Sequence, residues 1–194
     1  MTTTADQVAK GSTLRATLAF AASVAGDAAV QRILASLPAA ARERVRDAAA
    51  TDEVPFPVWR ALSDATEAEL GAAVPDWPER AGAWAIESTG LQLYGGILRK
   101  ASPIEFLTQS VSLFRLYYQP GDMKVVEHEA VGERGGRGVL RLVGFDHGSP
   151  IFCRRQTGGL RQAVALAGGE RPRVRHVRCV LAGDAFCEWE LRWS

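Results

Sequence analysis

The segment that decides the fold is RVRHVRCVLAGDAFCEWELRW, residues 173–193. Its second half is hydrophobic at every second position: Cys187, Trp189, Leu191 and Trp193. Gly183 supplies the turn, and centring the register on it places Cys179 opposite Cys187 and Val177 opposite Trp189. Alternation of this kind is typical of an antiparallel hairpin with one buried face. The C-terminus therefore predicts two paired strands that cover a hydrophobic core.

Two more strands are expected at residues 123–131 and 137–145, joined by the glycine-rich loop 132–138. Hydrophobic residues at helical spacing predict helices over 8–26, 28–37, 39–50, 58–74, 78–100 and 102–118. Residues 149–169 are expected to form a short element followed by a helix that ends at Gly168–Gly169. Helices come first and most strands follow, so the fold class is α+β, with helices packed on an antiparallel sheet. We expect one domain, residues 1–194. Residues 1–52 would form a helical N-terminal lobe, and residues 53–194 a helix-and-sheet core that ends in the hairpin.

Composition favours a globular protein. The chain has 194 residues, of which 47% are hydrophobic and 23% charged, with a net charge of +1; these values exclude a disordered chain and a coiled-coil rod. No uninterrupted apolar run approaches the roughly 18 residues of a membrane span, and the N-terminus lacks the features of a signal peptide. We therefore expect a cytoplasmic protein without a membrane span.

Positive charge is concentrated in one part of the chain. Ten arginines lie between Arg134 and Arg178, against two acids, Asp146 and Glu170. Such an excess can attract anionic partners. These arginines are spread over several expected elements, however, and no aromatic–basic RNA-binding signature accompanies them. A solvated arginine face is the favoured interpretation, and nucleic acid is not an expected partner.

The three cysteines, Cys153, Cys179 and Cys187, suggest a metal site. Zinc takes four nitrogen or sulfur ligands, and His176 is the candidate for the fourth. One alternative is that the cysteines are simply buried and act as small hydrophobic residues. A Cys179–Cys187 disulfide is a second alternative, which reducing conditions disfavour. A regular strand would also point His176 and Cys179 to opposite faces, so a bulge would be required between them.

The C-terminal motif resembles that of a known family. The residues that carry the resemblance are His176, Cys179, Gly183, Asp184, Cys187, Trp189 and Trp193. They resemble the end of the 4-vinyl-reductase-type small-molecule-binding domain, whose wider group includes haem–nitric-oxide-binding domains and TRAPP vesicle-tethering subunits. The segments KGSTLRATLAFA, LASLPAAARERV and FPVWRAL also resemble a paralogous family of uncharacterised myxobacterial proteins. The resemblance implies the ligand-binding fold shared by nitric-oxide-signalling and Golgi-transport proteins.

The resemblance also implies a cofactor. In phenol-sensing members of the family, three cysteines and one carboxylate hold a structural zinc. Carried over to this chain, the ligands would be Cys153, His176, Cys179 and Cys187, with His176 in place of the acid. Haem–nitric-oxide sensors have a haem-ligating histidine and a Tyr-x-Ser-x-Arg motif, and this sequence lacks that motif. The sequence therefore predicts zinc and no haem.

A ligand pocket is the last implication of the resemblance. It would lie between the helices and the sheet, with candidate lining residues Trp84, Tyr94, Phe106, Phe114, Tyr117 and Phe152. Alternatively, these aromatic residues form a solid core.

The sequence contains none of the nucleophile-elbow, phosphate-loop or metalloprotease motifs, so we do not expect an enzyme. The favoured function is a sensory module that binds a hydrophobic or aromatic small molecule and signals through a protein partner or a homodimer. The alternative is a TRAPP-like interaction scaffold without a small ligand.

Overall fold

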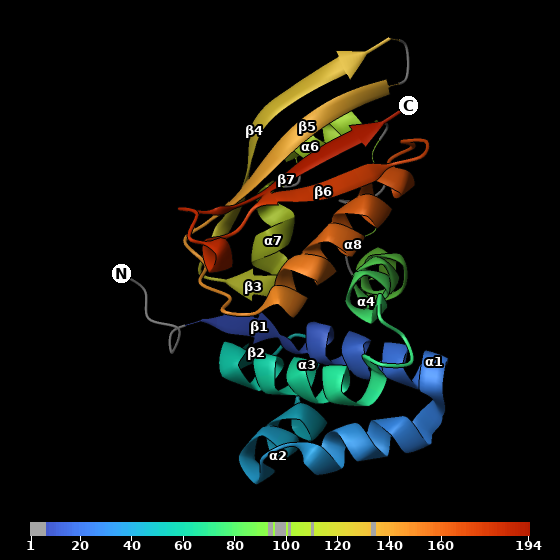
Figure 1. Cartoon of the computed structure of the whole chain (residues 1–194), viewed down its shortest axis with the longest axis vertical. Coiled ribbons are helices and arrows are strands. Elements are labelled where there is room, and N and C mark those ends of the chain that lie inside the picture. Colours follow the sequence, from blue (N-terminus) through green and yellow to red (C-terminus); the bar gives the residue numbers. More distant parts are fainter. Residues whose placement is uncertain (1–6, 93–94, 96–99, 101, 110, 133–134) are drawn as a thin grey trace.

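The computed structural model describes residues 7–92, 95, 100, 102–109, 111–132 and 135–194 (Figure 1). Its main sheet has the strand order β4-β5-β7-β6, and every neighbouring pair in it is antiparallel. The bounds of these strands are β4 Asp122–Val131, β5 Gly135–Val143, β6 Arg173–Arg178 and β7 Cys187–Trp193. A smaller sheet of order β2-β1-β3 is built from β1 Val8–Lys10, β2 Glu53–Pro55 and β3 Tyr118–Gln119.

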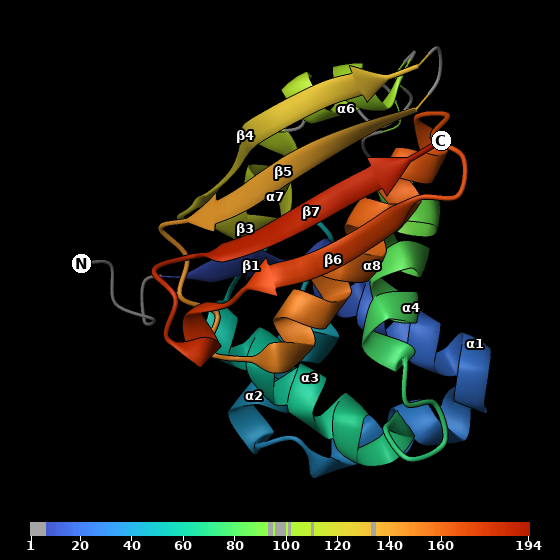
Figure 2. The same ribbon diagram turned by 45° about the horizontal axis from the view of Figure 1, so that its top comes forward.

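Helices cover one face of the main sheet (Figure 2). The helical elements are α1 Gly11–Ser36, α2 Ala39–Asp47, α3 Phe56–Leu70, α4 Trp77–Ala85, the π-helical turn η2 Ile86–Gly90, α6 Pro103–Gln109, α7 Val111–Tyr117, α8 Pro150–Leu166 and the short turn η3 Val180–Ala182. Helix α8 packs behind β6 and β7, whereas α6 and α7 pack behind β4 and β5. This arrangement confirms the predicted α+β class.

The N-terminal segment differs from its prediction. Residues 8–10 are expected to be helical, but they form β1 and pair with both β2 and β3. The helix begins only at Gly11, where a Cβ atom would lie 2.0 Å from the carbonyl oxygen of Ala49. Helix α1 then continues through both of the first two predicted helices, with a non-helical break at Gly26 (φ 77°). Strand pairing between distant segments overrides the local helical pattern here.

Helix α1 is the one described helix whose length and hydropathy would suit a membrane span. Its break at Gly26 leaves about 15 residues before the bend, or about 22 Å of straight helix, against about 30 Å of bilayer hydrocarbon. Its buried residues include Leu14, Phe20 and Ile33, which belong to the hydrophobic core. These features favour a core helix over the membrane span that its composition would allow.

The C-terminal hairpin has the predicted burial but a different register. Cys187, Trp189, Leu191 and Trp193 are all buried, as the alternation predicts. However, His176 and not Val177 lies opposite Trp189, because a bulge separates His176 from Arg178. The bulge changes the side-chain alternation just before Cys179.

Two glycines bring α4 and α8 into close backbone contact. A Cβ atom at Gly82 would lie 2.1 Å from the carbonyl oxygen of Arg155, and one at Gly158 would lie 1.9 Å from that of Glu79. Any larger residue at either position would push the two helices apart. The close contact holds α8 in position between the sheet and the N-terminal helices (Figure 1).

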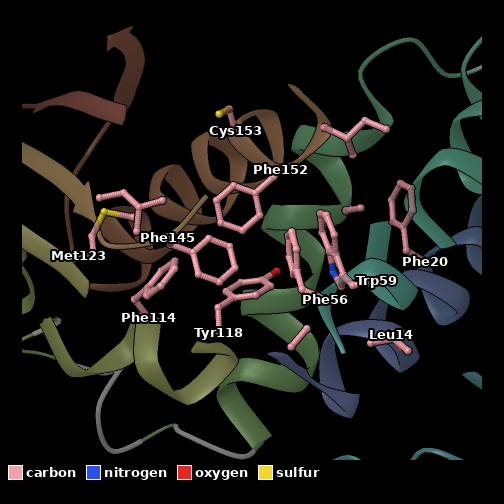
Figure 3. Close-up of a cluster of buried hydrophobic side chains, with 14 of the residues drawn as sticks. Leu14, Phe20, Phe56, Trp59, Phe114, Tyr118, Met123, Phe145, Phe152 and Cys153 are labelled. Atoms are coloured by element: carbon pink, nitrogen blue, oxygen red, sulfur yellow. The ribbon is translucent and has the colours of Figure 1, made fainter. Parts of the chain in front are cut away.

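Aromatic side chains fill the core where the two sheets and α8 meet (Figure 3). Phe152 of α8 lies at the centre of the group, which also contains Phe56, Trp59, Phe114, Tyr118 and Phe145. Their ring centroids lie 4.9–6.4 Å apart, mostly edge to face, as aromatic rings prefer. One connected core extends from Ala9 to Trp193.

Candidate functional site: a cysteine–histidine tetrad and two internal cavities

Four side chains from separate segments converge at one end of α8. They are His147 in the loop after β5, Cys153 in the first turn of α8, Cys179 directly after β6, and Cys187 at the start of β7. Each offers one ligand atom, and the four atoms all lie within 4.8 Å of one another. We call these residues the tetrad. Cys179 is partly exposed and the other three are buried.

The distances within the tetrad suit one metal ion at its centre, bound by all four residues. His147 Nε2 lies 3.2 Å from Cys187 Sγ and 3.3 Å from Cys153 Sγ. Each pair of sulfur atoms is 3.9 Å apart, which is too far for a disulfide, whose S–S bond is about 2.05 Å long. All three cysteines are free thiols. Thiolate and imidazole groups together are ligands for soft and borderline transition-metal ions.

Neighbouring groups orient the tetrad. His147 Nδ1 lies 2.9 Å from the carbonyl oxygen of Ser149 and 3.2 Å from its backbone nitrogen. In the tautomer that carries the proton on Nδ1, this carbonyl accepts a hydrogen bond and the Nε2 lone pair faces the sulfurs. The His147 ring also stacks on Phe152, with centroids 4.8 Å apart. At the hairpin, the backbone N–H of Cys179 donates to Asp184 Oδ2, and that of Val180 donates to Cys187 Sγ.

The crowded thiols shift one another's pKa values. The pKa of Cys153 is raised, chiefly by its hydrogen bond to Cys187 and then by burial. The pKa of Cys187 is lowered, chiefly by that same hydrogen bond, although burial opposes the change. Of these two thiols, Cys187 is therefore the more acidic and Cys153 the less acidic.

The predicted ligand His176 does not belong to the tetrad, which corrects the sequence-based assignment. Its ring stacks on Trp189 with centroids 4.6 Å apart, and it lies close enough to Cys187 to help lower the pKa of that thiol. His147 takes its place, and the sequence analysis missed it. The available signal was the segment His147-Gly-Ser-Pro150, because a proline that starts a helix places the preceding histidine beside the first helical turn, where Cys153 lies.

Two adjoining cavities lie beside α8, between it and the helices and strands that face it. The first, of about 70 Å³, is apolar and is lined by Ile86, Phe106, Phe114, Tyr117, Tyr118, Met123, Leu140, Gln156, Gly159, Leu160 and Ala163. We call it the apolar cavity. The second, of about 60 Å³, shares five of these residues and adds Ser12, Thr13, Ala16, Gly82, Ala85, Thr89 and Arg155. We call it the polar cavity, because hydroxyl groups and a guanidinium group line part of it.

Only some of the residues predicted to line a pocket lie at a cavity. Phe106, Phe114 and Tyr117 line the apolar cavity. Trp84 instead packs edge to face against Phe20 of α1, and Phe152 lies at the centre of the aromatic core. Tyr94 lies outside the described residues. Helical spacing identified residues that point inward, but only the packing of α6, α7 and α8 shows which of them border empty space.

Comparison with known proteins identifies the fold. No protein-family model matches the chain, and no curated protein matches it. Among solved structures, an H-NOX protein from S. oneidensis in the Fe(II)NO state is similar, with a TM-score of 0.69 and 12% identity over 95% of this chain and 99% of that one. The Fe(II) unliganded H-NOX protein from K. algicida matches with a TM-score of 0.67 and 12% identity, over 95% and 96% of the two chains. A third similar structure concerns haem redox potential and porphyrin distortion, with a TM-score of 0.62 and 13% identity, over 94% and 98% of the two chains.

These neighbours refine one sequence-based prediction and correct another. The fold is that of haem–nitric-oxide-binding domains, whereas the finer resemblance to 4-vinyl-reductase-type domains, TRAPP subunits and the myxobacterial paralogues finds no support among them. The prediction of zinc as cofactor is wrong by the same comparison, because the descriptions of these similar structures refer to haem and iron. At 12–14% identity, the likeness extends to the fold alone.

Proposed function

We propose that this chain is a sensory domain that binds a small hydrophobic or aromatic molecule in its interior and is not an enzyme. The observation that carries the proposal is the apolar cavity of about 70 Å³ behind the sheet. Protein interiors are close-packed, and the few voids larger than a water molecule are exceptions. An apolar void is therefore a natural place for a small apolar ligand.

The cavity also favours ligand binding over the scaffold alternative. A scaffold with a solid core would fill this space with side chains, whereas here Gly159 and Ala163 of α8 leave it open. Gln156 and Tyr118 border both cavities and are polar groups that can orient a ligand. The sharing of a fold with haem–nitric-oxide-binding domains supports a sensory role.

The described residues do not fit haem. None of the three histidines lines either cavity: His128 is exposed on β4, His147 belongs to the tetrad, and His176 stacks on Trp189. Pockets for ligands of drug size occupy about 300–1,000 Å³, far more than the 60 and 70 Å³ available here. Met123, Tyr117 and Tyr118 are of types that can ligate haem iron, but the space beside them is too small for a porphyrin. We therefore propose a ligand other than haem.

Xenon tests the cavity without assuming a ligand, because it occupies dry apolar voids in proteins. We expect xenon binding in the wild-type protein, measured by xenon NMR or in a xenon-pressurised crystal. Ala163→Val adds two methyl groups beside the apolar cavity and should abolish this binding. The matched control is Ala165→Val, on the same helix but exposed, which should bind xenon as the wild type does. Equal binding by both variants, or no xenon in the wild type, would contradict the proposal.

We also propose that the tetrad binds one transition-metal ion with a structural role. Its support is the convergence of three sulfurs and one imidazole nitrogen from segments as distant as His147 and Cys187. Without an ion, only weak S–H hydrogen bonds would hold the three thiols and the histidine together. An ion would tie the start of α8 to the hairpin and so stabilise the folded state.

The two histidines provide a matched test of this site. Elemental analysis of the purified chain should find about one transition-metal ion per chain. That ion should be lost in His147→Ala and retained in His176→Ala, because only His147 belongs to the tetrad. Loss of the metal should also lower the thermal unfolding temperature of His147→Ala. Metal-free wild-type protein with reduced thiols, or equal metal content in the two variants, would refute the assignment.

We propose that ligand binding is transmitted to a protein partner or to a second copy of the chain. The support is the sheet face opposite the helices, which is open in the described structure (Figure 2). Mass measurement of the purified protein with and without phenol, by light scattering, tests the homodimer. An unchanged monomer in both conditions would leave only a protein partner as the route.

A further inference from the structure

Two neighbouring arginines of α8 have opposite environments. Arg154 is partly exposed and donates hydrogen bonds of 2.7 Å to both carboxylate oxygens of Glu79. Arg155 is only 4% exposed and forms no ion pair with any described residue. Within the described part of the chain, its guanidinium group makes one hydrogen bond, to Thr17 Oγ1 at 3.0 Å, although it has five N–H donors. Its Cζ atom also lies 5.8 Å from the ring centroid of Trp59.

A buried cation without a counter-charge destabilises a folded protein. Burial lowers the pKa of Arg155, but arginine keeps its proton in proteins. Tyr118, the titratable group that interacts with it, does not supply the missing negative charge, because burial raises the pKa of its phenol. A purely structural role here would be served better by a methionine or a leucine. The unbalanced charge therefore points to a ligand.

The polar cavity is where such a ligand would meet Arg155. Arg155 lines it together with Ser12, whose hydroxyl is buried (1% exposed) and makes no hydrogen bond. A polar group left unpaired in the interior has a free-energy cost that a ligand can remove. Among the described residues, none that lines this cavity is acidic. The apolar cavity adjoins it through Gln156, Tyr118 and Gly159.

We propose that the two cavities together bind a small carboxylic acid. Its carboxylate would accept hydrogen bonds from Arg155 and Ser12 in the polar cavity, and its hydrocarbon part would occupy the apolar cavity. A monovalent anion balances the single buried cation, whereas a phosphate dianion would leave one charge unbalanced. Arginine and carboxylate also match in geometry, since the guanidinium plane can donate two parallel hydrogen bonds. This inference rests on the proposed function and specifies its ligand class.

The experiment compares benzoate with benzamide, which has nearly the same shape and no charge. Binding is measured by calorimetry and by thermal unfolding, at low salt in a buffer free of other carboxylates. We expect benzoate to bind the wild type at least about tenfold more tightly than benzamide, as a charge-assisted hydrogen bond requires. Arg155→Met should abolish this preference, and Ser12→Ala should weaken it. Arg154→Met is the matched control and should keep it, because Arg154 does not line the cavity.

The outcomes separate this inference from the proposed function. If benzoate and benzamide bind the wild type equally, or if Arg155→Met keeps the preference, the carboxylate assignment is wrong while the binding cavity stands. If neither compound binds and xenon also fails to enter, both proposals fall. The wild-type preference alone is decisive should Arg155→Met not fold, so the test does not depend on that variant.

Discussion

Alanine substitutions at Gly158 and Gly159 give a direct test of the α4–α8 contact. Both residues lie inside α8, so replacing either glycine with alanine should favour the helix by the same amount, about 0.5–1 kcal/mol. Their surroundings differ. A Cβ atom at Gly159 would lie 3.5 Å from its nearest neighbours, which is ordinary contact, whereas one at Gly158 would lie 1.9 Å from the carbonyl oxygen of Glu79.

The gain in helix propensity cancels when the two variants are compared. What remains is the cost of overpacking at Gly158, about 1–3 kcal/mol. We expect Gly159→Ala to be about 0.5–1 kcal/mol more stable than the wild type, and Gly158→Ala to be less stable than Gly159→Ala by the overpacking cost. For a chain of this length, that difference corresponds to about 2–12 °C in the unfolding temperature.

Urea unfolding followed by tryptophan fluorescence measures both variants against the wild type. Comparable slopes of unfolding free energy against urea would show that the comparison concerns stability alone. If Gly158→Ala proves as stable as Gly159→Ala, the two helices do not approach as closely as described. The placement of Arg155 and of both cavities, which depends on that approach, would then be wrong as well.

Three further substitutions test other parts of the structure. Phe152→Ala should cost about 3–5 kcal/mol of unfolding free energy in urea, because the side chain is fully buried among aromatic rings; a loss below about 1 kcal/mol would contradict that packing. Glu188→Gln should lower the free energy of unfolding by about 1 kcal/mol, measured by thermal unfolding at low salt. The reason is that Glu188 accepts a 2.7 Å hydrogen bond from Arg141 and also faces Arg178. Unchanged stability would show that these ion pairs contribute nothing. Without ligand, Arg155→Met should raise the unfolding free energy by at least about 1 kcal/mol, since it removes an unbalanced buried charge; a marked loss of stability would mean that the charge has a partner after all.

Local pattern was sufficient for the four strands of the main sheet and for most helices. The alternation through Cys187, Trp189 and Leu191 depends only on the two-residue period of a strand, and the structure buries this face as predicted. The pattern failed where pairing partners are distant in sequence. Residues 8–10 have a helical pattern, yet they form β1 because β2 and β3 offer them hydrogen bonds from both sides.

The candidate site was predictable in part. Hairpin geometry suggested that Cys179 and Cys187 lie close together, and the structure places them 3.9 Å apart, with Cys153 equally close to both. His147 was missed because the loop that carries it has no regular period, so its position depends on how α8 packs against the hairpin. His176 was chosen for its proximity in sequence, but the bulge after it and its stacking on Trp189 hold it outside the tetrad.

By itself, the amino-acid sequence determined which residues turn inward, because hydrophobic periodicity depends on the geometry of a single helix or strand. Only the tertiary structure decided what those residues meet: a fourth tetrad member, an empty space beside Gly159, or a buried guanidinium without a counter-charge. These features arise where α4, α8 and the sheet come together. Contacts between distant segments produce no periodic pattern in the amino-acid sequence.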